Sequence, residues 1–175
     1  MNYKRFYIEN SMVFITIVTY QRNKLLLNYV DLIKQALLYT KTKYKFVITA
    51  YVILEDHMHI ILKPEIIEDY PNIIKTFKTF LSRNIKVQNV KLTKSMQNKN
   101  EKGIWQSRYW AHVIIDENDL HRHLDYIHYN PMKHYQIPPK DWEYSSFQNF
   151  VEKGFYKLNW CNFEDRNNIK DLNFE

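Results

Sequence analysis

Two histidines two residues apart, His57 and His59, are the first candidates for chemistry in this sequence. They lie in the run DHMHIIL, whose later residues are typical of a buried strand. Successive side chains of a strand point to opposite faces of a sheet, so both imidazoles should project from one face, roughly 6–7 Å apart along the strand. Two imidazoles on one rigid face can bind one divalent metal ion.

A second group of polar side chains follows in the segment DLHRHLDYIHYN, residues 119–130. Three apolar residues there, Leu120, Leu124 and Ile127, have the i, i+4, i+7 spacing of a helical core stripe. A second stripe, about a quarter turn away at ~100° per residue, combines an acid, an imidazole, a phenol and an amide. Its members are Asp119, His123, Tyr126 and Asn130. His123 is expected to be exposed.

A tyrosine near a metal ion held by two histidines has a specific chemical use. The metal ion acts as a Lewis acid on a phosphodiester oxygen, the phenolate attacks phosphorus, and the deoxyribose 3′-oxygen leaves. The 5′-phosphotyrosine link conserves the energy of the broken bond, so the strand can be rejoined. A nearby cation favours the phenolate by lowering the pKa of the phenol, ordinarily ~10. Tyr129 competes with Tyr126, but it lies ~60–100° around the helix.

The elements that must position these residues follow from hydrophobic periodicity. We expect a strand at 14–20, a helix at 29–42, strands at 45–54 and 57–63, a helix from Pro71 with apolar residues through Leu81, and a strand at 105–115. This βαββαβ order predicts an α+β fold, the ferredoxin-like plait with an antiparallel four-stranded sheet. Two helices should cover one face, which leaves the other for a site or for the last helix.

The remaining segments are predicted as follows. Residues 91–103 lack periodicity and should be a flexible loop. The helix that carries Tyr126 begins after an acidic N-cap and should end at Asn130, before Pro131. We divide the chain into a catalytic domain, 1–131, and a C-terminal extension, 132–175, packed on the same domain. The extension has a short helix at 145–153, and Trp142 and Phe147 should fasten it to the domain.

Aromatic side chains before and within the last predicted strand need to be sorted between its two faces. Alternation puts Trp105 and Tyr109 on one face and Trp110 on the other, so one of these two sets should be buried.

Composition favours nucleic acid as the partner. The chain has 175 residues, a net charge of +6 and 16% aromatic residues, which suits a polyanion whose bases can stack. Its two glycines lie outside any phosphate-binding loop. The single cysteine excludes an internal disulfide, and we see neither an export signal nor a membrane span. We therefore expect a cytoplasmic protein. The candidate DNA-binding residues are Lys4, Arg5, Arg22, Lys24, Arg108 and Lys133.

Three separated motifs, in the correct order, resemble the REP-associated tyrosine transposases, a branch of the HUH single-tyrosine transposases of insertion sequences. The resemblance runs from about residue 7 to residue 160. His57-Met58-His59 is similar to the His–hydrophobic–His (HUH) motif, with Glu55 where proline is common. The three motifs that are similar to the REP-associated tyrosine transposases are IWQSRYW at 104–110, LDYIHYNPMKH at 124–134 and DWEYSSF at 141–147.

The resemblance implies roles for individual residues. Tyr126 matches the nucleophile, and His57 and His59 match the metal ligands. Asn130 occupies the position where insertion-sequence relatives have glutamine as a third ligand, and its side chain is one methylene shorter. The resemblance also implies Mg²⁺ or Mn²⁺ as the cofactor, single-stranded DNA with a hairpin as the substrate, and a bacterial protein associated with the nucleoid. The sequence leaves monomer and homodimer open: one tyrosine per chain would let a dimer cut two strands, whereas a monomer could cut one.

Two other functions fit part of the pattern. One is a nucleic-acid-binding plait without catalysis, although the glycine-containing aromatic strand signature of RNA-recognition modules is absent. The other is a metal-dependent hydrolase in which the two histidines and a third one activate water. If the protein is such a hydrolase, Tyr126→Phe should stay active. The tyrosine mechanism instead predicts that this substitution abolishes cleavage completely while DNA binding is retained.

Overall fold

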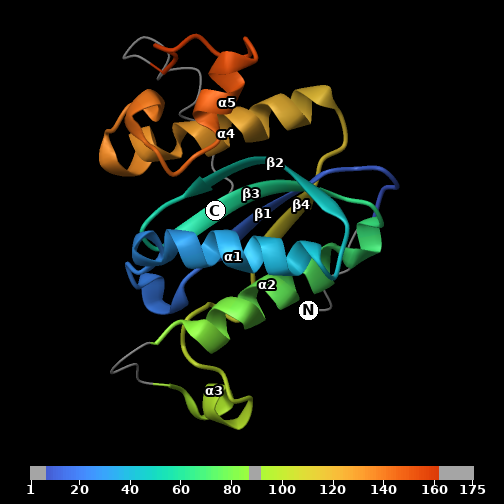
Figure 1. Ribbon diagram of the computed structural model, residues 1–175, viewed down its shortest axis with the longest axis vertical. Helices are drawn as coiled ribbons and strands as arrows, with labels where there is room; N and C mark the ends of the chain where they lie inside the picture. The colour runs from blue at the N-terminus through green and yellow to red at the C-terminus, as the bar shows by residue number, and fades with distance from the viewer. Residues whose placement is uncertain (1–6, 87–91, 162–175) are drawn as a thin grey trace.

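The computed structural model describes residues 7–86 and 92–161. Its centre is one antiparallel sheet in the order β2-β3-β1-β4 (Figure 1). The strands are β1 (Val13–Val18), β2 (Phe46–Ile53), β3 (His57–Pro64) and β4 (Trp110–Val113). Antiparallel pairing in this order, with helices after the first and third strands, is the arrangement of the ferredoxin-like plait, which confirms the predicted fold.

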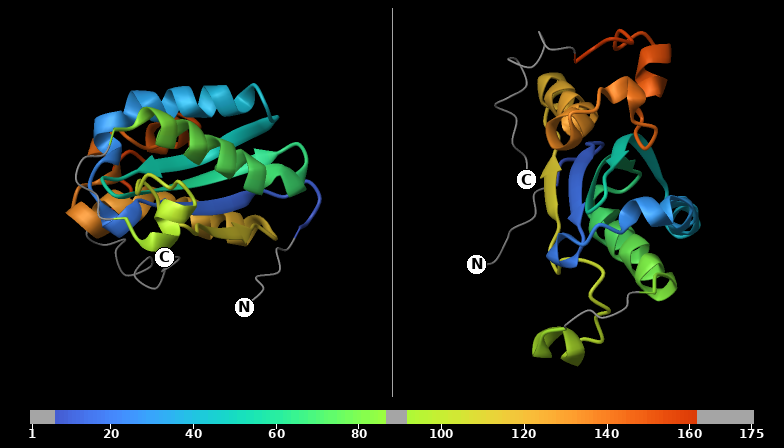
Figure 2. Two further views of the ribbon diagram at one scale, coloured as in Figure 1. Left: turned by 90° about the horizontal axis from the view of Figure 1, so that it is seen from below. Right: turned by 90° about the vertical axis from the view of Figure 1, so that its left-hand side faces the viewer.

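Helices cover both faces of the sheet. Figure 2 shows α1 (Val30–Lys41) and α2 (Tyr70–Asn84) on one face, and α4 (Glu117–Tyr135) and α5 (Phe147–Glu152) on the other. The strands alternate between two apolar cores: Ile15 packs under α1 and α2, whereas its neighbour Phe14 packs with residues of α4. The last long helix therefore lies on the face that the sequence left open.

Helix α4 does not end before Pro131, so that prediction was wrong. It continues to Tyr135 and ends at Gln136, whose left-handed φ of 59° closes the last turn. A proline inside a helix costs about 3 kcal/mol, partly because it donates no backbone hydrogen bond. Tertiary contacts offset that cost: the Tyr135 hydroxyl accepts the N–H of Glu55 at 3.2 Å, and its ring stacks on Trp142.

Two other elements differ from prediction. Strand β4 covers only Trp110–Val113, because Trp105 forms just an isolated bridge with Thr19 before the chain turns away. The predicted loop at 91–103 contains a short helix, α3 (Lys94–Asn98), whose first turn is capped by the Thr93 hydroxyl. Short 3-10 helices occupy Tyr20–Arg22, Leu26–Tyr29, Ile67–Asp69 and Pro139–Asp141.

The C-terminal residues pack on the sheet through the aromatics that were predicted to fasten them. The Trp142 indole N–H donates to the Ile53 carbonyl at 3.1 Å, and Phe147 is fully buried. The predicted boundary between residues 131 and 132 falls inside α4, so the division into two parts stays a prediction. Within the described ranges, no helix is long and apolar enough to cross a membrane.

Candidate active site

The two histidines lie on the face of the sheet that α4 covers. His57 begins β3, and both side chains are buried, with ring centroids 5.0 Å apart. Their strand partners are Val18 and Thr16 of β1, which places them on the central strands. The predicted geometry, two imidazoles side by side on one face, is present.

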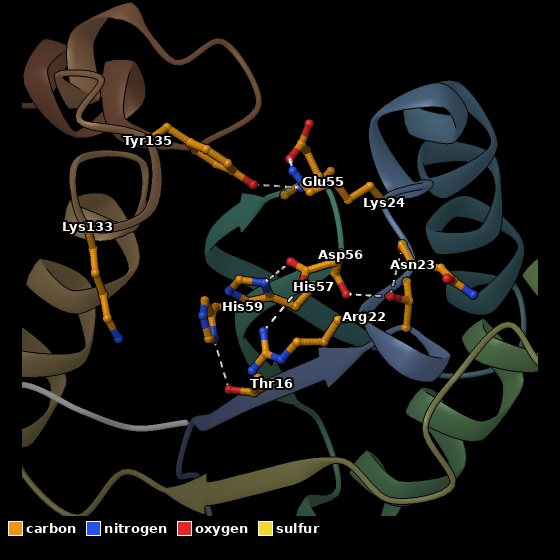
Figure 3. A network of polar contacts seen from close by, with 12 residues as sticks. Thr16, Arg22, Asn23, Lys24, Glu55, Asp56, His57, His59, Lys133 and Tyr135 are labelled. Atoms are coloured by element: carbon orange, nitrogen blue, oxygen red, sulfur yellow. Dashed lines mark hydrogen bonds and ion pairs between the residues drawn. The ribbon is translucent and has the colours of Figure 1, made fainter.

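Each histidine is held through its Nδ1 atom. His57 Nδ1 donates to the Asp56 carboxylate at 2.6 Å, and His59 Nδ1 shares a hydrogen bond with the Thr16 hydroxyl at 2.8 Å (Figure 3). Contacts of this kind fix the orientation of an imidazole and leave Nε2 as the coordinating nitrogen. Both rings are therefore oriented as metal ligands require.

The Asp56 carboxylate has a second partner, the Arg22 guanidinium. Arg22 Nη1 donates to this carboxylate at 3.2 Å. Burial alone would raise the pKa of the Asp56 carboxyl, but the hydrogen bond from His57 and the Arg22 guanidinium hold that pKa below its ordinary value. The ionised carboxylate keeps the proton of His57 on Nδ1. Arg22, predicted to bind DNA, therefore lies where it stabilises the site.

Tyr126 reaches the histidines from α4. Its side chain is buried, and its ring centroid lies 5.2 Å from that of His59. Lys133, two turns further along α4, places Nζ 3.3 Å from the phenolic oxygen and 5.1 Å from the centre of the ring. An ammonium group in this position favours the phenolate. Lys133 was predicted to contact DNA, but the structure places it beside the phenol.

Asn130 lies on the same helix face, one turn after Tyr126. Its Nδ2 donates to the Tyr126 carbonyl at 2.6 Å, and the residue is fully buried. Its Oδ1 atom, also buried, has no hydrogen-bond partner among the described residues. One turn further, the His134 ring lies 5.0 Å from that of His57. Asn130 thus sits between two residues that contact the histidine pair, and an amide oxygen available there fits a cation.

A second cluster of possible metal ligands lies nearby. His112, Asp119 and His123 offer ligand atoms that all lie within 4.8 Å of one another, so a metal ion could be held there. His123 is buried against Phe14, and the prediction that it is exposed was wrong. Burial lowers the pKa of His123, which favours the neutral imidazole.

The other predicted basic residues differ in their surroundings. Lys24 forms an ion pair with Glu55 at 2.8 Å, and Glu55 raises the pKa of the lysine. Arg108 is exposed just before β4. Lys4 and Arg5 lie outside the described residues. Tyr129, the competing nucleophile, packs against a separate apolar cluster that contains Met132 and Cys161.

The structure adds positioning residues that sequence patterns did not identify. Thr16 becomes relevant only through strand pairing, which no local pattern encodes. Asp56 had a signal, because a carboxylate next to a ligand histidine is a frequent partner of its Nδ1 atom. Lys133 and His134 had one too: they lie seven and eight residues after Tyr126, on the same face of a continuous helix. This spacing was missed because the helix was predicted to end before Pro131.

Comparison with known proteins gives consistent matches. Residues 7–130 match the model of the IS200-like transposase family. A candidate REP-associated tyrosine transposase of Haemophilus influenzae is 39% identical over 162 residues, covering 91% of this chain and 92% of its own. A REP-associated tyrosine transposase of Escherichia coli is 34% identical over 162 residues, covering 91% and 90%. A solved REP-associated tyrosine transposase bound to a REP hairpin has a TM-score of 0.75 at 30% identity, covering 93% and 92%.

Proposed function

The chain belongs to the family of IS200-like transposases, and we propose that it cuts and rejoins hairpin-containing single-stranded DNA through a covalent bond to Tyr126. The observation that carries this proposal is the position of the Tyr126 ring, 5.2 Å from that of His59 on a face where both histidines are held by their Nδ1 atoms. The similar solved structure is bound to a REP hairpin, which supports a hairpin as the substrate.

The reaction exchanges one phosphodiester for another. The Tyr126 oxygen forms a bond to phosphorus as the bond from phosphorus to the 3′-oxygen breaks. The phenol loses its proton, and the departing 3′-oxygen gains one. The 5′ end stays attached to the protein until a 3′-hydroxyl attacks the phosphotyrosine and regenerates the phenol. No net bond energy is lost, so cutting and joining are one reaction in two directions.

The chain's own residues divide the work. Nε2 of His57 and His59, together with Asn130 Oδ1, would hold a divalent ion, which we propose to be Mg²⁺ or Mn²⁺. When bound, such an ion supplies Lewis-acid polarisation of a phosphate oxygen. Oxygen ligands suit Mg²⁺ better than imidazoles do, so phosphate and water would complete the shell. Lys133 favours the ionised form of Tyr126 until phosphorus is attacked.

A covalent adduct assay tests the proposal. The protein is mixed with Mn²⁺ and a labelled single-stranded oligonucleotide that carries a hairpin and its flanking sequence, and is then denatured. Wild type should retain the label, Tyr126→Phe should bind the DNA without retaining it, and the matched control Tyr129→Phe should behave as wild type. Cleavage that persists in Tyr126→Phe would instead indicate the metal-dependent hydrolase.

A further inference from the structure

Three aromatic rings form a stack at the edge of the sheet, beside the site. The rings of Trp110 and His112 have centroids 5.9 Å apart and planes 8° apart. His112 then stacks on His123, with centroids 4.8 Å and planes 15° apart. His123 is buried at the inner end, whereas Trp110 is 36% exposed at the outer end. The stack thus ends in an indole that is accessible to solvent.

Asp119 holds the two imidazoles of the stack in place. Its Oδ2 lies 2.7 Å from His112 Nε2, and its Oδ1 lies 3.0 Å from His123 Nδ1. Burial would raise the pKa of the Asp119 carboxyl, but hydrogen bonds from His112 and from the Ile115 N–H hold that pKa below its ordinary value. An ionised carboxylate that bridges two rings restricts their rotation, so His112 is a rigid support for the indole.

The stack occupies the same face as the histidine pair, and Trp110 lies in the same row across the sheet as His59. Thr16 of β1 pairs with His59 on one side and with Trp110 on the other. Neighbouring strands are about 4.8 Å apart, so Trp110 lies roughly 10 Å across the sheet from His59. Phe14 touches both, with ring centroids 5.5 Å from Trp110 and 5.4 Å from His59. The exposed indole is therefore next to the proposed phosphate site.

We propose that Trp110 stacks against a nucleobase of the single-stranded DNA beside the phosphate that is cut. The inference rests on the proposed function, since it needs a phosphate at His57 and His59. Every base has a π-face, and exposed aromatics beside a backbone-binding site are the usual platforms for unpaired bases. The rings behind Trp110 extend such a stack inward. Its role is to position the strand, whereas Tyr126 carries the chemistry.

Binding measurements in the Tyr126→Phe background test this subsite without cleavage. Adding Trp110→Ala should weaken binding of the single-stranded substrate roughly 5- to 150-fold, the usual range for one stacked base, whereas Trp110→Phe should retain most of the affinity. The matched control is Tyr39→Ala, a comparably exposed aromatic on α1 at the opposite face. If the Trp110→Ala protein binds the single-stranded substrate as tightly as its parent, the proposal is overturned.

Abasic substitutions in the oligonucleotide identify the stacked base without relying on a variant's stability. Removing each base near the cut in turn should weaken binding to the Trp110 protein at one position. The same removal should cost little in the Trp110→Ala protein, because the stack is already lost. Losses that add independently at every position would contradict the proposal. If these stacking tests fail while the wild-type protein still forms its covalent adduct with the intact oligonucleotide, only the Trp110 subsite is refuted and the proposed function stands.

The cluster of His112, Asp119 and His123 could bind a metal ion instead of supporting Trp110, and this alternative gives a second test of the proposal. If His112, Asp119 and His123 served as metal ligands, the protein would bind a second equivalent of Mn²⁺ that His112→Ala removes. We expect His112→Ala to leave the number of bound Mn²⁺ ions unchanged and to weaken DNA binding in the same direction as Trp110→Ala. Loss of an ion without a change in DNA affinity would assign the cluster to metal and overturn the stacking role.

Discussion

At the scale of single residues, Asn130 is where this chain departs from the motif it resembles. The proposed ligand is one methylene shorter than glutamine, yet its Oδ1 is buried without a hydrogen-bond partner in the described part of the chain. The Nδ2 bond to the Tyr126 carbonyl restrains the amide, which turns Oδ1 away from that carbonyl. The shorter side chain is thus compatible with a ligand role.

Metal dependence tests Asn130 directly. Asn130→Ala should raise the Mn²⁺ concentration needed for half-maximal adduct formation roughly 10- to 100-fold, the usual effect of weakening a metal site. Asn130→Asp keeps an oxygen and should stay closer to wild type. The comparison uses saturating DNA and circular dichroism to verify folding. An unchanged Mn²⁺ requirement in Asn130→Ala would remove this residue from the ligand set.

Lys133 should set the pH dependence of cutting. Its Nζ lies 3.3 Å from the Tyr126 oxygen, so it favours the phenolate. Replacing it by methionine should move the rising limb of the cleavage rate to higher pH, with a rate loss of about tenfold near neutral pH. Lys133→Arg should retain the wild-type profile. A uniform loss at every pH would indicate that Lys133 binds DNA instead, as the sequence suggested.

At the scale of elements, α4 is the part that assembles the site. It carries Tyr126 and Asn130 on one face, and its last turn adds Lys133 and His134. Helix α4 is also joined to the segment before α5, because His128 Nε2 shares a hydrogen bond with the Ser146 hydroxyl at 2.9 Å. That hydroxyl also bonds to the Tyr51 backbone of β2. Helix, strand and C-terminal segment therefore meet at the Ser146 hydroxyl, to which the helix contributes one buried histidine.

This histidine should make stability depend on pH. Burial lowers the pKa of His128 to about 3 from 6.5, so between those values the unfolded chain binds a proton that the folded chain does not. The free energy of unfolding should therefore fall on acidification from pH 6.5 towards 3, by up to about 1.4 kcal/mol per pH unit from this group.

The matched variant is His128→Gln, whose amide can still bond to Ser146. It should be less stable than wild type at pH 7, and the gap should shrink as the pH falls through that window. Urea unfolding at pH 7, 6, 5 and 4 measures the gap, and carboxyl groups that titrate in both proteins cancel. A gap that stays constant would show that His128 is not buried in its neutral form.

At the scale of the whole molecule, the net charge of +6 predicts salt-dependent DNA binding. The slope of log K against log salt is negative, and each phosphate contact on a single strand increases its magnitude by about 0.7. Arg108→Ala should reduce the slope by about that amount, because Arg108 is exposed beside β4.

Lys24→Ala should change the slope less, since Glu55 already balances this lysine at 2.8 Å. The control is Lys34→Ala, on α1 at the opposite face of the sheet, which should leave the slope unchanged. Fluorescence anisotropy over a range of NaCl concentrations gives the slopes. Equal slopes for the Arg108→Ala protein and wild type would remove Arg108 from the interface.

Much of this protein could be predicted from local patterns. Apolar runs and turns determined the order of strands and helices, and hence the plait, because secondary-structure periodicity is a short-range property. The two-residue spacing of His57 and His59 determined that they share a face, and the helical spacing of Tyr126 and Asn130 did the same for α4. Motif resemblance then connected the two groups.

Only the tertiary structure decided how those groups meet. Local rules end a helix at Pro131, but α4 continues to Tyr135, whose hydroxyl bonds to the β2–β3 hairpin, and the added turn brings Lys133 to the phenol. Strand pairing, which joins residues far apart in sequence, supplied Thr16 to His59 and put Trp110 in the same row. Such contacts depend on packing between elements, a long-range property that no sequence window contains.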